Sequence, residues 1–215
     1  MGFKNAINMK KILLIDYKLG NHQSVANTLT FLGYDFLISN SPADIKRAQA
    51  YILPGVGAFP EAMKNLKAIG IVDVLAHEVI KRKKPILGVC LGMQILANDS
   101  VENGFHKGLG WVSGHVAKVP PGQEIRVPHV GWNNIHAVSK NPLFSRVSSN
   151  TNFYFDHSYH FVCNNKFVAA TFIYGHKMIA AIQKDNIFGV QFHPEKSQNN
   201  GLRIYRSFFN YCGIN

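Results

Sequence analysis

Short apolar runs alternate with segments of helical spacing through the first half of the chain. The apolar runs are typical of buried strands and lie at 11–17, 34–39, 50–55 and 85–90. The segments that favour helices lie at about 25–32, 42–49, 61–84 and from 91 onward. Strands that alternate with helices pair in parallel through right-handed crossovers, and ligands bind beyond the carboxyl ends of such strands.

The second half of the chain has a different pattern. Strand-like runs separated by Pro, Gly and Asn lie at 115–119, 133–138, 152–162, 167–175, 178–184 and 187–193. The segment 200–212 has the apolar spacing of a helix. We therefore predict an α/β fold with a mostly parallel central sheet flanked by helices, and with additional antiparallel strands in the second half.

The size and composition favour one domain. The chain has 215 residues, of which 47% are hydrophobic and 16% are charged, as expected of a single globular domain. We assign this domain to residues 11–215 and expect residues 1–10 to be a disordered extension. No apolar run approaches the roughly 20 residues of a membrane span, and the N-terminus lacks the apolar segment of a signal peptide. We expect no membrane contact and a cytoplasmic location.

The net charge of +11 and the three cysteines limit the partners and cofactors. The only dense basic run, 81–84, falls at the expected end of a helix, where cations suit the helix dipole. Nucleic-acid binding is therefore disfavoured, and an acidic protein partner explains the charge equally well. Cys90, Cys163 and Cys212 form no CxxC pair and are odd in number. They predict neither a metal site nor a disulfide framework, and no cofactor is expected.

Cys90 stands between Gly88 and Gly92, where a strand is expected to end and a helix to begin. This spacing resembles that of the G-x-S-x-G turn, which exposes a nucleophile at the edge of a sheet. A thiol at a helix N-terminus forms the reactive thiolate more readily. Cys90 is therefore a candidate nucleophile, and the alternative is a buried cysteine beside packing glycines.

His193 is the candidate base for this nucleophile. It follows a predicted strand, and Glu195 stands two residues further on. If the backbone stays extended there, both side chains face the same way, and the carboxylate can orient the imidazole. The alternative is an ordinary surface histidine at a strand end.

The segment "LPGVGAF" at 53–59 is a candidate for stabilising an oxyanion. Gly55 and Gly57 allow the backbone to turn N–H groups toward a ligand, although the same glycines could simply build a turn. The segment matches neither a P-loop nor a dinucleotide-binding motif.

Together, "LPGVGAF", "GVCLGMQ" and "FHPEKS" resemble the class I (triad) glutamine amidotransferases, a family with a flavodoxin-like fold. More narrowly, "VPHVGWN" at 127–133 and "FYFDHSYHF" at 153–161 resemble the glutaminase subunits of imidazole glycerol phosphate synthase. The resemblance runs from about Lys11 to the C-terminus.

The resemblance implies a role for each motif residue. Cys90 attacks glutamine to give a glutamyl thioester and ammonia, His193 relays the proton, and Glu195 orients it. Backbone N–H groups of Val56 and Leu91 form the oxyanion hole, the former after a peptide flip that Gly55 and Gly57 allow. The residues implied to bind the glutamine backbone groups are Gln94, Ser158 and Tyr159.

The resemblance also implies a partner. The family forms a heterodimer with a (β/α)₈ barrel cyclase, and ammonia passes to that subunit to make imidazole glycerol phosphate and AICAR in histidine biosynthesis. Tyr154 and Lys196 match interface residues near the active site. Glutaminase activity is implied to be low until the cyclase binds its ligand.

One departure from the family leaves the pathway open. The first turn reads "DYKLGNHQS", with Lys18 for the usual glycine and His22 for an apolar residue, and we expect this turn to lie away from the catalytic residues. Three alternatives therefore stand beside histidine biosynthesis. They are a paralogous glutaminase subunit that supplies a surface-sugar amidotransferase, a stand-alone cysteine hydrolase or peptidase of the same fold, and a non-catalytic binding module.

Overall fold

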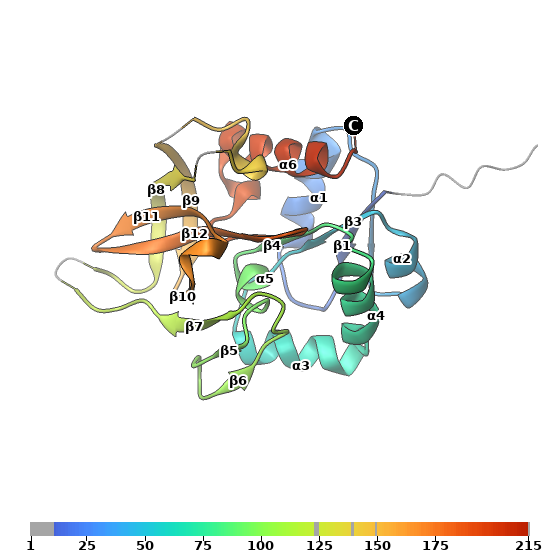
Figure 1. Cartoon of the computed structure of the whole chain (residues 1–215), viewed down its shortest axis with the longest axis horizontal. Helices are drawn as coiled ribbons and strands as arrows, with labels where there is room; N and C mark the ends of the chain where they lie inside the picture. Colours follow the sequence, from blue (N-terminus) through green and yellow to red (C-terminus); the bar gives the residue numbers. More distant parts are fainter. Residues whose placement is uncertain (1–10, 123–124, 139, 149, 215) are drawn as a thin grey trace, which may run out of the picture.

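The computed structural model describes residues 11–122, 125–138, 140–148 and 150–214. The predicted extension at 1–10 lies outside the described residues. In the described part of the chain, one sheet of nine strands runs through the centre in the order β2-β1-β3-β4-β13-β12-β11-β8-β9 (Figure 1). A second sheet of four strands lies beside it in the order β10-β7-β5-β6.

The first part of the large sheet is parallel, as predicted. Its strands are β1 (Ile12–Ile15), β2 (Phe36–Ser39), β3 (Ala50–Leu53), β4 (Ile86–Val89) and β13 (Ile187–Val190). All residues of β1, β3, β4 and β13 are buried, because these strands are covered on both faces. The expectation that the run at 34–39 is a buried strand is wrong, since β2 forms the edge of the sheet and is mostly half-buried.

The second part of the large sheet is antiparallel, as expected. It contains β8 (His129–Ala137), β9 (Thr151–His157), β11 (Val168–Tyr174) and β12 (His176–Lys184). The small sheet contains β5 (Asp99–Ser100), β6 (His106–Lys107), β7 (Gly114–Lys118) and β10 (Tyr159–Cys163). The predicted strand at 152–162 is therefore two strands, because the chain leaves the large sheet at Ser158 and pairs with β7 in the small one.

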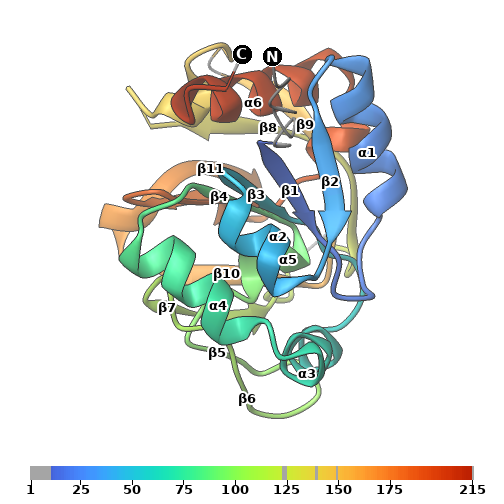
Figure 2. The ribbon, with the colours of Figure 1, turned by 90° about the vertical axis from the view of Figure 1, so that its right-hand side faces the viewer.

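Helices cover both faces of the parallel strands (Figure 2). One face packs against α1 (His22–Phe31) and α6 (Gln198–Tyr211). The other face packs against α2 (Pro42–Arg47), α3 (Phe59–Ile69) and α4 (Val72–Ala76). Short helices are α5 (Leu91–Gln94), the π-helix η1 (His77–Lys81), and the 3-10 turns η2 (Pro142–Phe144), η3 (Asn165–Phe167) and η4 (Pro194–Lys196).

The single helix expected over 61–84 is broken. It ends at Gly70, whose φ of +76° is a left-handed conformation that suits glycine and terminates helices. The chain then restarts as α4 and continues into the π-helix η1. The apolar spacing runs through the break because both helices bury the same side against the sheet, so the spacing alone does not reveal it.

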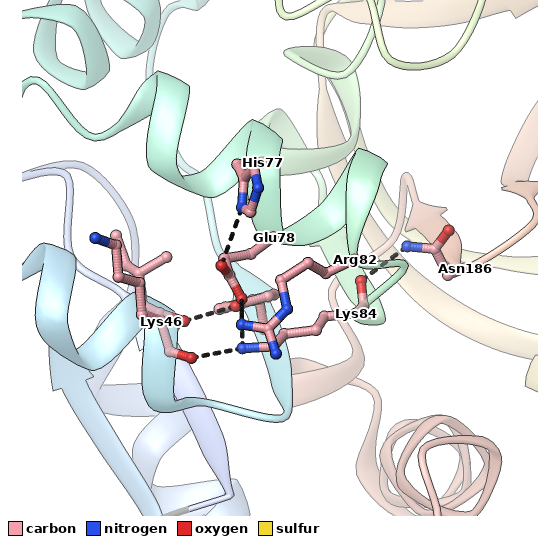
Figure 3. Close-up of polar contacts among 8 residues, drawn as sticks. Lys46, His77, Glu78, Arg82, Lys84 and Asn186 are labelled. Carbon is pink, nitrogen blue, oxygen red and sulfur yellow. Dashed lines mark hydrogen bonds and ion pairs between the residues drawn. The ribbon is translucent and has the colours of Figure 1, made fainter.

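The basic run at 81–84 begins at the last residue of this π-helix, and two of its residues contact a buried carboxylate (Figure 3). Glu78 is 1% exposed, and its carboxylate lies 2.6 Å from Lys84 Nζ and 3.3 Å from an Arg82 nitrogen. Burial alone would raise the pKa of Glu78, but the hydrogen bonds from Lys84 and His77, together with the charges of Lys84 and Arg82, outweigh burial and hold that pKa below its ordinary value. Lys84 Nζ also donates to the Lys46 carbonyl at 2.7 Å. Part of the positive charge therefore stabilises the amino end of the sheet.

Candidate active site

A cavity of about 290 Å³ opens beyond the carboxyl ends of β3 and β4. It lies where the parallel sheet was expected to bind ligands. The residues that line it are Val56, Gly57, Cys90, Leu91, Gln94, Glu102, Pro128, Asp156, His157, Ser158, Tyr159 and His193. The fold therefore brings together residues that the sequence analysis selected from segments far apart in the chain.

Cys90 occupies a tight turn between β4 and α5. Its φ of +53° is rare for a residue other than glycine. A Cβ atom on Gly92 would lie 1.8 Å from the Leu53 carbonyl oxygen, and one on Gly88 would lie 2.6 Å from the Gly92 oxygen. Both glycines are required by close backbone contacts, which confirms the predicted strand–turn–helix geometry. The helix that follows begins at Leu91, as predicted, and is a single turn.

His193 and Glu195 form a buried pair behind this cysteine. His193 Nδ1 lies 2.8 Å from Glu195 Oε1, and each side chain is 2% exposed. The backbone does not stay extended after His193, because Pro194 starts the 3-10 turn η4. The turn nevertheless brings the carboxylate back to the imidazole, so the expected contact forms by a different local structure.

The charges around His193 favour its protonated form. Burial alone would lower its pKa, but the charge and hydrogen bond of Cys90, together with those of Glu195, outweigh burial and raise the pKa to about 10. Because Nδ1–H is donated to the carboxylate, Nε2 is the nitrogen left to exchange a proton with the thiol. The arrangement is that of a nucleophile, a base and a residue that orients the base.

Two further groups contact the Cys90 sulfur. Gln191 Nε2 lies 3.7 Å from Sγ, and the Asp156 carbonyl oxygen lies 3.8 Å from it. Gln191 is fully buried, and its Oε1 accepts a hydrogen bond from Gln94 Nε2 at 3.1 Å. The sequence analysis missed Gln191, although a polar residue in the apolar run at 187–192 is a signal that could have found it.

The wall opposite the catalytic pair comes from the break between β9 and β10. Gln94 donates to the Tyr159 carbonyl at 2.8 Å, and Ser158 and Tyr159 both line the cavity. Glu102 also lines it, held in place because its Oε2 accepts the Phe59 N–H at 2.9 Å. The sequence analysis missed Glu102, which lies in a short polar loop without a motif.

The loop of residues 54–57 forms the rim of the cavity on the side of β3. A Cβ atom on Gly55 would lie 2.5 Å from the Gly92 nitrogen, so the loop touches the turn that carries the cysteine. Val56 is 38% exposed, and Gly57 has a φ of +104°. Leu91, the other predicted oxyanion residue, is buried at the start of α5. The two predicted N–H donors thus lie on neighbouring backbone segments.

The first turn of the chain also reaches this loop. A Cβ atom on Gly20 would lie 3.2 Å from the Pro54 side chain. The turn therefore lies beside the loop 54–57, because β1 and β3 are adjacent strands and end at the same edge of the sheet. That it lies away from Cys90, His193 and Glu195 stays a prediction.

Two buried histidines extend the wall of the cavity into the large sheet. His157 Nδ1 donates to the Tyr159 carbonyl at 2.9 Å, so its Nε2 must accept from His129 Nδ1, at 3.2 Å. Burial lowers the pKa of His157 to about 3 and that of His129 to about 4. Both rings are therefore uncharged near neutral pH. The sequence analysis missed this pair, which no motif spacing indicates.

Tyr154 and Lys196 lie on the outer side of the catalytic residues. Lys196 Nζ lies 5.3 Å from the centre of the Tyr154 ring, within reach of a cation–π contact. The Tyr154 ring centre is 6.4 Å from that of His193 and 6.0 Å from that of Trp132. Trp132 and Val130 on β8 are 45% and 56% exposed. An apolar, aromatic surface therefore adjoins the site.

Metal-binding clusters and membrane-spanning helices are both absent from the residues that the structure describes. These residues contain no group of three His, Cys, Asp or Glu side chains placed to hold a metal ion. None of the helices among them has the length and apolar character to span a bilayer.

Comparison with known sequences gives a consistent result. The family model described as "Glutamine amidotransferase class-I" matches residues 13–211. The "Imidazole glycerol phosphate synthase subunit HisH 2" of Vibrio vulnificus is 48% identical over 95% of this chain and 96% of its own length. The "Imidazole glycerol phosphate synthase subunit HisH" of Geobacter sulfurreducens is 43% identical over 93% of this chain and 98% of its own.

Solved structures support the fold. "Crystal structure of glutamine amidotransferase" superposes with a TM-score of 0.74 at 18% identity, over 94% of this chain and 99% of that one. "Structure of PurLQS from Thermotoga maritima" superposes with a TM-score of 0.71 at 18% identity, over 93% and 97%.

Proposed function

Because the chain belongs to the class I glutamine amidotransferases and, among them, to the HisH subunits of imidazole glycerol phosphate synthase, we propose that Cys90, His193 and Glu195 hydrolyse glutamine in its cavity. The observation that carries this proposal is the geometry of the three side chains. A cysteine held at a strained turn lies beside an imidazole whose other nitrogen is fixed by a buried carboxylate.

The reaction follows from that geometry. His193 Nε2 takes the thiol proton, and Cys90 Sγ attacks the carbon of the glutamine side-chain amide. The backbone N–H groups of Val56 and Leu91 stabilise the oxyanion of the tetrahedral intermediate. His193 then returns the proton to the leaving nitrogen, the C–N bond breaks, and ammonia leaves a glutamyl thioester. Water, deprotonated by His193, hydrolyses the thioester to glutamate and restores the thiol.

Polar groups on the cavity wall account for the choice of glutamine. The carboxylate of Glu102 suits the α-ammonium group of a free amino acid. Gln94, Ser158 and Tyr159 surround the place left for its other backbone groups, and Gln94 is fixed by the Tyr159 carbonyl. A peptide-bound glutamine has no α-ammonium group, so these contacts favour the free amino acid over a peptide.

The partner is the (β/α)₈ barrel cyclase that converts the ammonia and a ribonucleotide into imidazole glycerol phosphate and AICAR in histidine biosynthesis. The relatives' names describe them as subunits of this synthase, which supports a partner subunit. The exposed Val130 and Trp132, next to Tyr154 and Lys196, provide an apolar surface beside the cavity. A barrel docked there would receive ammonia before it enters bulk water.

The experiment that tests this function is glutamate release by the purified chain, alone and then with the cyclase of the same organism and its ribonucleotide substrate. We expect slow release alone and strong activation by the cyclase and ribonucleotide together. Activation by a surface-sugar amidotransferase instead would overturn the pathway but keep the catalytic residues. Rapid turnover of peptides without a partner would indicate a stand-alone hydrolase. The names of the relatives favour none of these alternatives.

A further inference from the structure

Tyr17 lies directly beneath the loop that carries the proposed oxyanion donor. It follows β1 by two residues, at the edge of the sheet where the cavity opens, and its side chain is fully buried. Its hydroxyl donates to the Pro54 carbonyl oxygen at 2.5 Å. Pro54 is the first residue of the loop 54–57, so this bond fixes the point at which the loop leaves β3.

The next residue of the loop is held between Tyr17 and the turn of the nucleophile. A Cβ atom on Gly55 would lie 2.7 Å from the Tyr17 hydroxyl oxygen and 2.5 Å from the Gly92 nitrogen. No larger side chain fits there without a shift of the backbone. Beyond Gly55 the loop is free of such contact, since Val56 and Gly57 are both exposed. Rotation of the loop is therefore confined to the peptides that follow Gly55.

We propose that Tyr17 is a positioning residue for glutamine hydrolysis, whose hydroxyl anchors the Pro54 carbonyl so that the Val56 N–H reaches the oxyanion. This inference rests on the proposed glutaminase function. The hydroxyl keeps its proton and so remains a hydrogen-bond donor. Burial, and to a smaller extent the charge of Cys90, raise the pKa of Tyr17 far above its ordinary value. The phenol therefore stays protonated throughout the pH range of any assay.

The test is Tyr17→Phe, which keeps the buried ring and removes the hydroxyl. In the complex with the cyclase and its ribonucleotide, we expect kcat for glutamate release to fall by about tenfold, the effect of about 1.4 kcal/mol of lost transition-state stabilisation. We expect the KM for glutamine to stay within about twofold, because the oxyanion forms only after substrate has bound. Synthesis from added ammonia, which needs the folded complex but no oxyanion loop, should be unchanged.

A second measurement distinguishes an effect on the oxyanion loop from an effect on the reactivity of Cys90. Alkylation of Cys90 by iodoacetamide, followed by mass spectrometry of its peptide, requires the thiolate but no oxyanion hole. Its rate and pH profile should be unchanged in Tyr17→Phe. The other two cysteines will not compete, because burial raises the pKa of Cys163 to about 11 and that of Cys212 to about 12.

Tyr51→Phe is the matched control. Tyr51 is also fully buried, and its hydroxyl donates to the Ile45 carbonyl at 2.7 Å, away from the cavity. It should lose similar stability and keep the wild-type kcat. The proposal would be overturned if kcat stayed unchanged in Tyr17→Phe, or if Tyr51→Phe lost as much kcat as Tyr17→Phe. It would also be overturned if the rate of Cys90 alkylation in Tyr17→Phe fell as much as kcat. Absence of glutamate release by the wild-type complex would instead overturn the proposed function.

Discussion

The conformation of Cys90 shows how a single residue shapes the proposed active site. A sparsely populated backbone conformation costs a residue with a Cβ atom about 1–3 kcal/mol, and Cys90 adopts one, with φ +53° and ψ −110°. Gly88 and Gly92 permit the close backbone contacts around this turn, since a Cβ atom at either position would clash with backbone atoms. The turn thereby places the sulfur at the cavity, beside His193.

Replacement of Cys90 by alanine tests whether this residue is needed only for glutamine hydrolysis and not for assembly with the cyclase. We expect Cys90→Ala to abolish glutamine hydrolysis, because no other group can form the thioester, and to leave complex formation and ammonia-dependent synthesis intact. Steady-state assays with glutamine and with ammonium chloride measure both activities. Loss of the ammonia-dependent reaction as well would show that the role of Cys90 has been misassigned.

The raised pKa of His193 predicts a pH dependence of stability. The folded state holds a proton on this ring up to about pH 10, whereas the unfolded state loses it near the ordinary value of 6.5. The contribution to stability is therefore complete below about pH 6.5 and is lost as the pH rises toward 10. In Glu195→Gln we expect stability to fall less between pH 6.5 and 10, because one of the charged groups that raise the pKa of His193 has become neutral.

Urea denaturation across that pH range measures the effect. Glu61→Gln, the same change at an exposed position of α3, is the control and should follow the wild type. A Glu195→Gln profile that coincides with the wild type would mean that the carboxylate does not hold the charge on His193.

The residues that could be predicted are those with a backbone signature. Cys90 was marked by its glycines, and His193 with Glu195 by their spacing around Pro194. Gln191 carries no such signature, because it follows β13 and its partners Cys90 and Gln94 come from the turn and the helix after β4. His129 and His157 carry none either, because they are polar side chains on two different strands and meet across the sheet. Their pairing depends on the register between strands, which the sequence does not display.

At the scale of elements, the turn after β1 illustrates a departure from the family. Lys18, where the family usually has glycine, has a φ of +64°. Glycine adopts this conformation without strain, so we expect Lys18→Gly to raise the free energy of unfolding by about 0.5–1 kcal/mol, after allowance for the more flexible unfolded chain. Chemical denaturation near neutral pH measures the change.

Lys64→Gly provides a contrast for the same chemical change. Lys64 is exposed in the middle of α3, where glycine should lower stability by about 1 kcal/mol. A loss of stability in both variants would show that Lys18 makes contacts that outweigh its backbone strain.

The boundaries of elements were less predictable than their existence. The apolar spacing of 61–84 continues through Gly70, because both helices bury the same side. The apolar run at 152–162 likewise continues through Ser158, because both sheets bury aromatic residues there. In each case a single residue, Gly70 or Ser158, ends one element. The apolar pattern of the sequence continues past it because the residues on both sides are buried in the core.

At the scale of the whole molecule, the parallel order of the strands and the antiparallel second half followed from the sequence. The assignment of one domain to residues 11–215 remains a prediction. The positive charge is partly explained, since Arg82 and Lys84 neutralise Glu78 at the end of the sheet opposite the cavity. The surface beside the cavity is instead apolar and aromatic, which is why we expect docking to depend on packing there.

Trp132→Ala tests that surface. An exposed tryptophan at the centre of an interface commonly contributes about 2 kcal/mol, so we expect the Kd for the cyclase to rise about 30-fold. Calorimetric titration of the two subunits measures it. Phe31→Ala, at a side chain 75% exposed near the end of α1, should have no effect. Equal weakening by both variants would argue against docking at β8.

The break at Ser158 has a mechanical consequence. Ser158 and Tyr159 are the point at which the backbone passes from the large sheet to the small one, and both line the cavity. A glutamine molecule bound there would contact residues at the junction of the two sheets and Cys90 at the same time. Turnover would then release that contact once per cycle, while Val116 and Phe161 of the small sheet stay packed in the core that they share with the parallel strands.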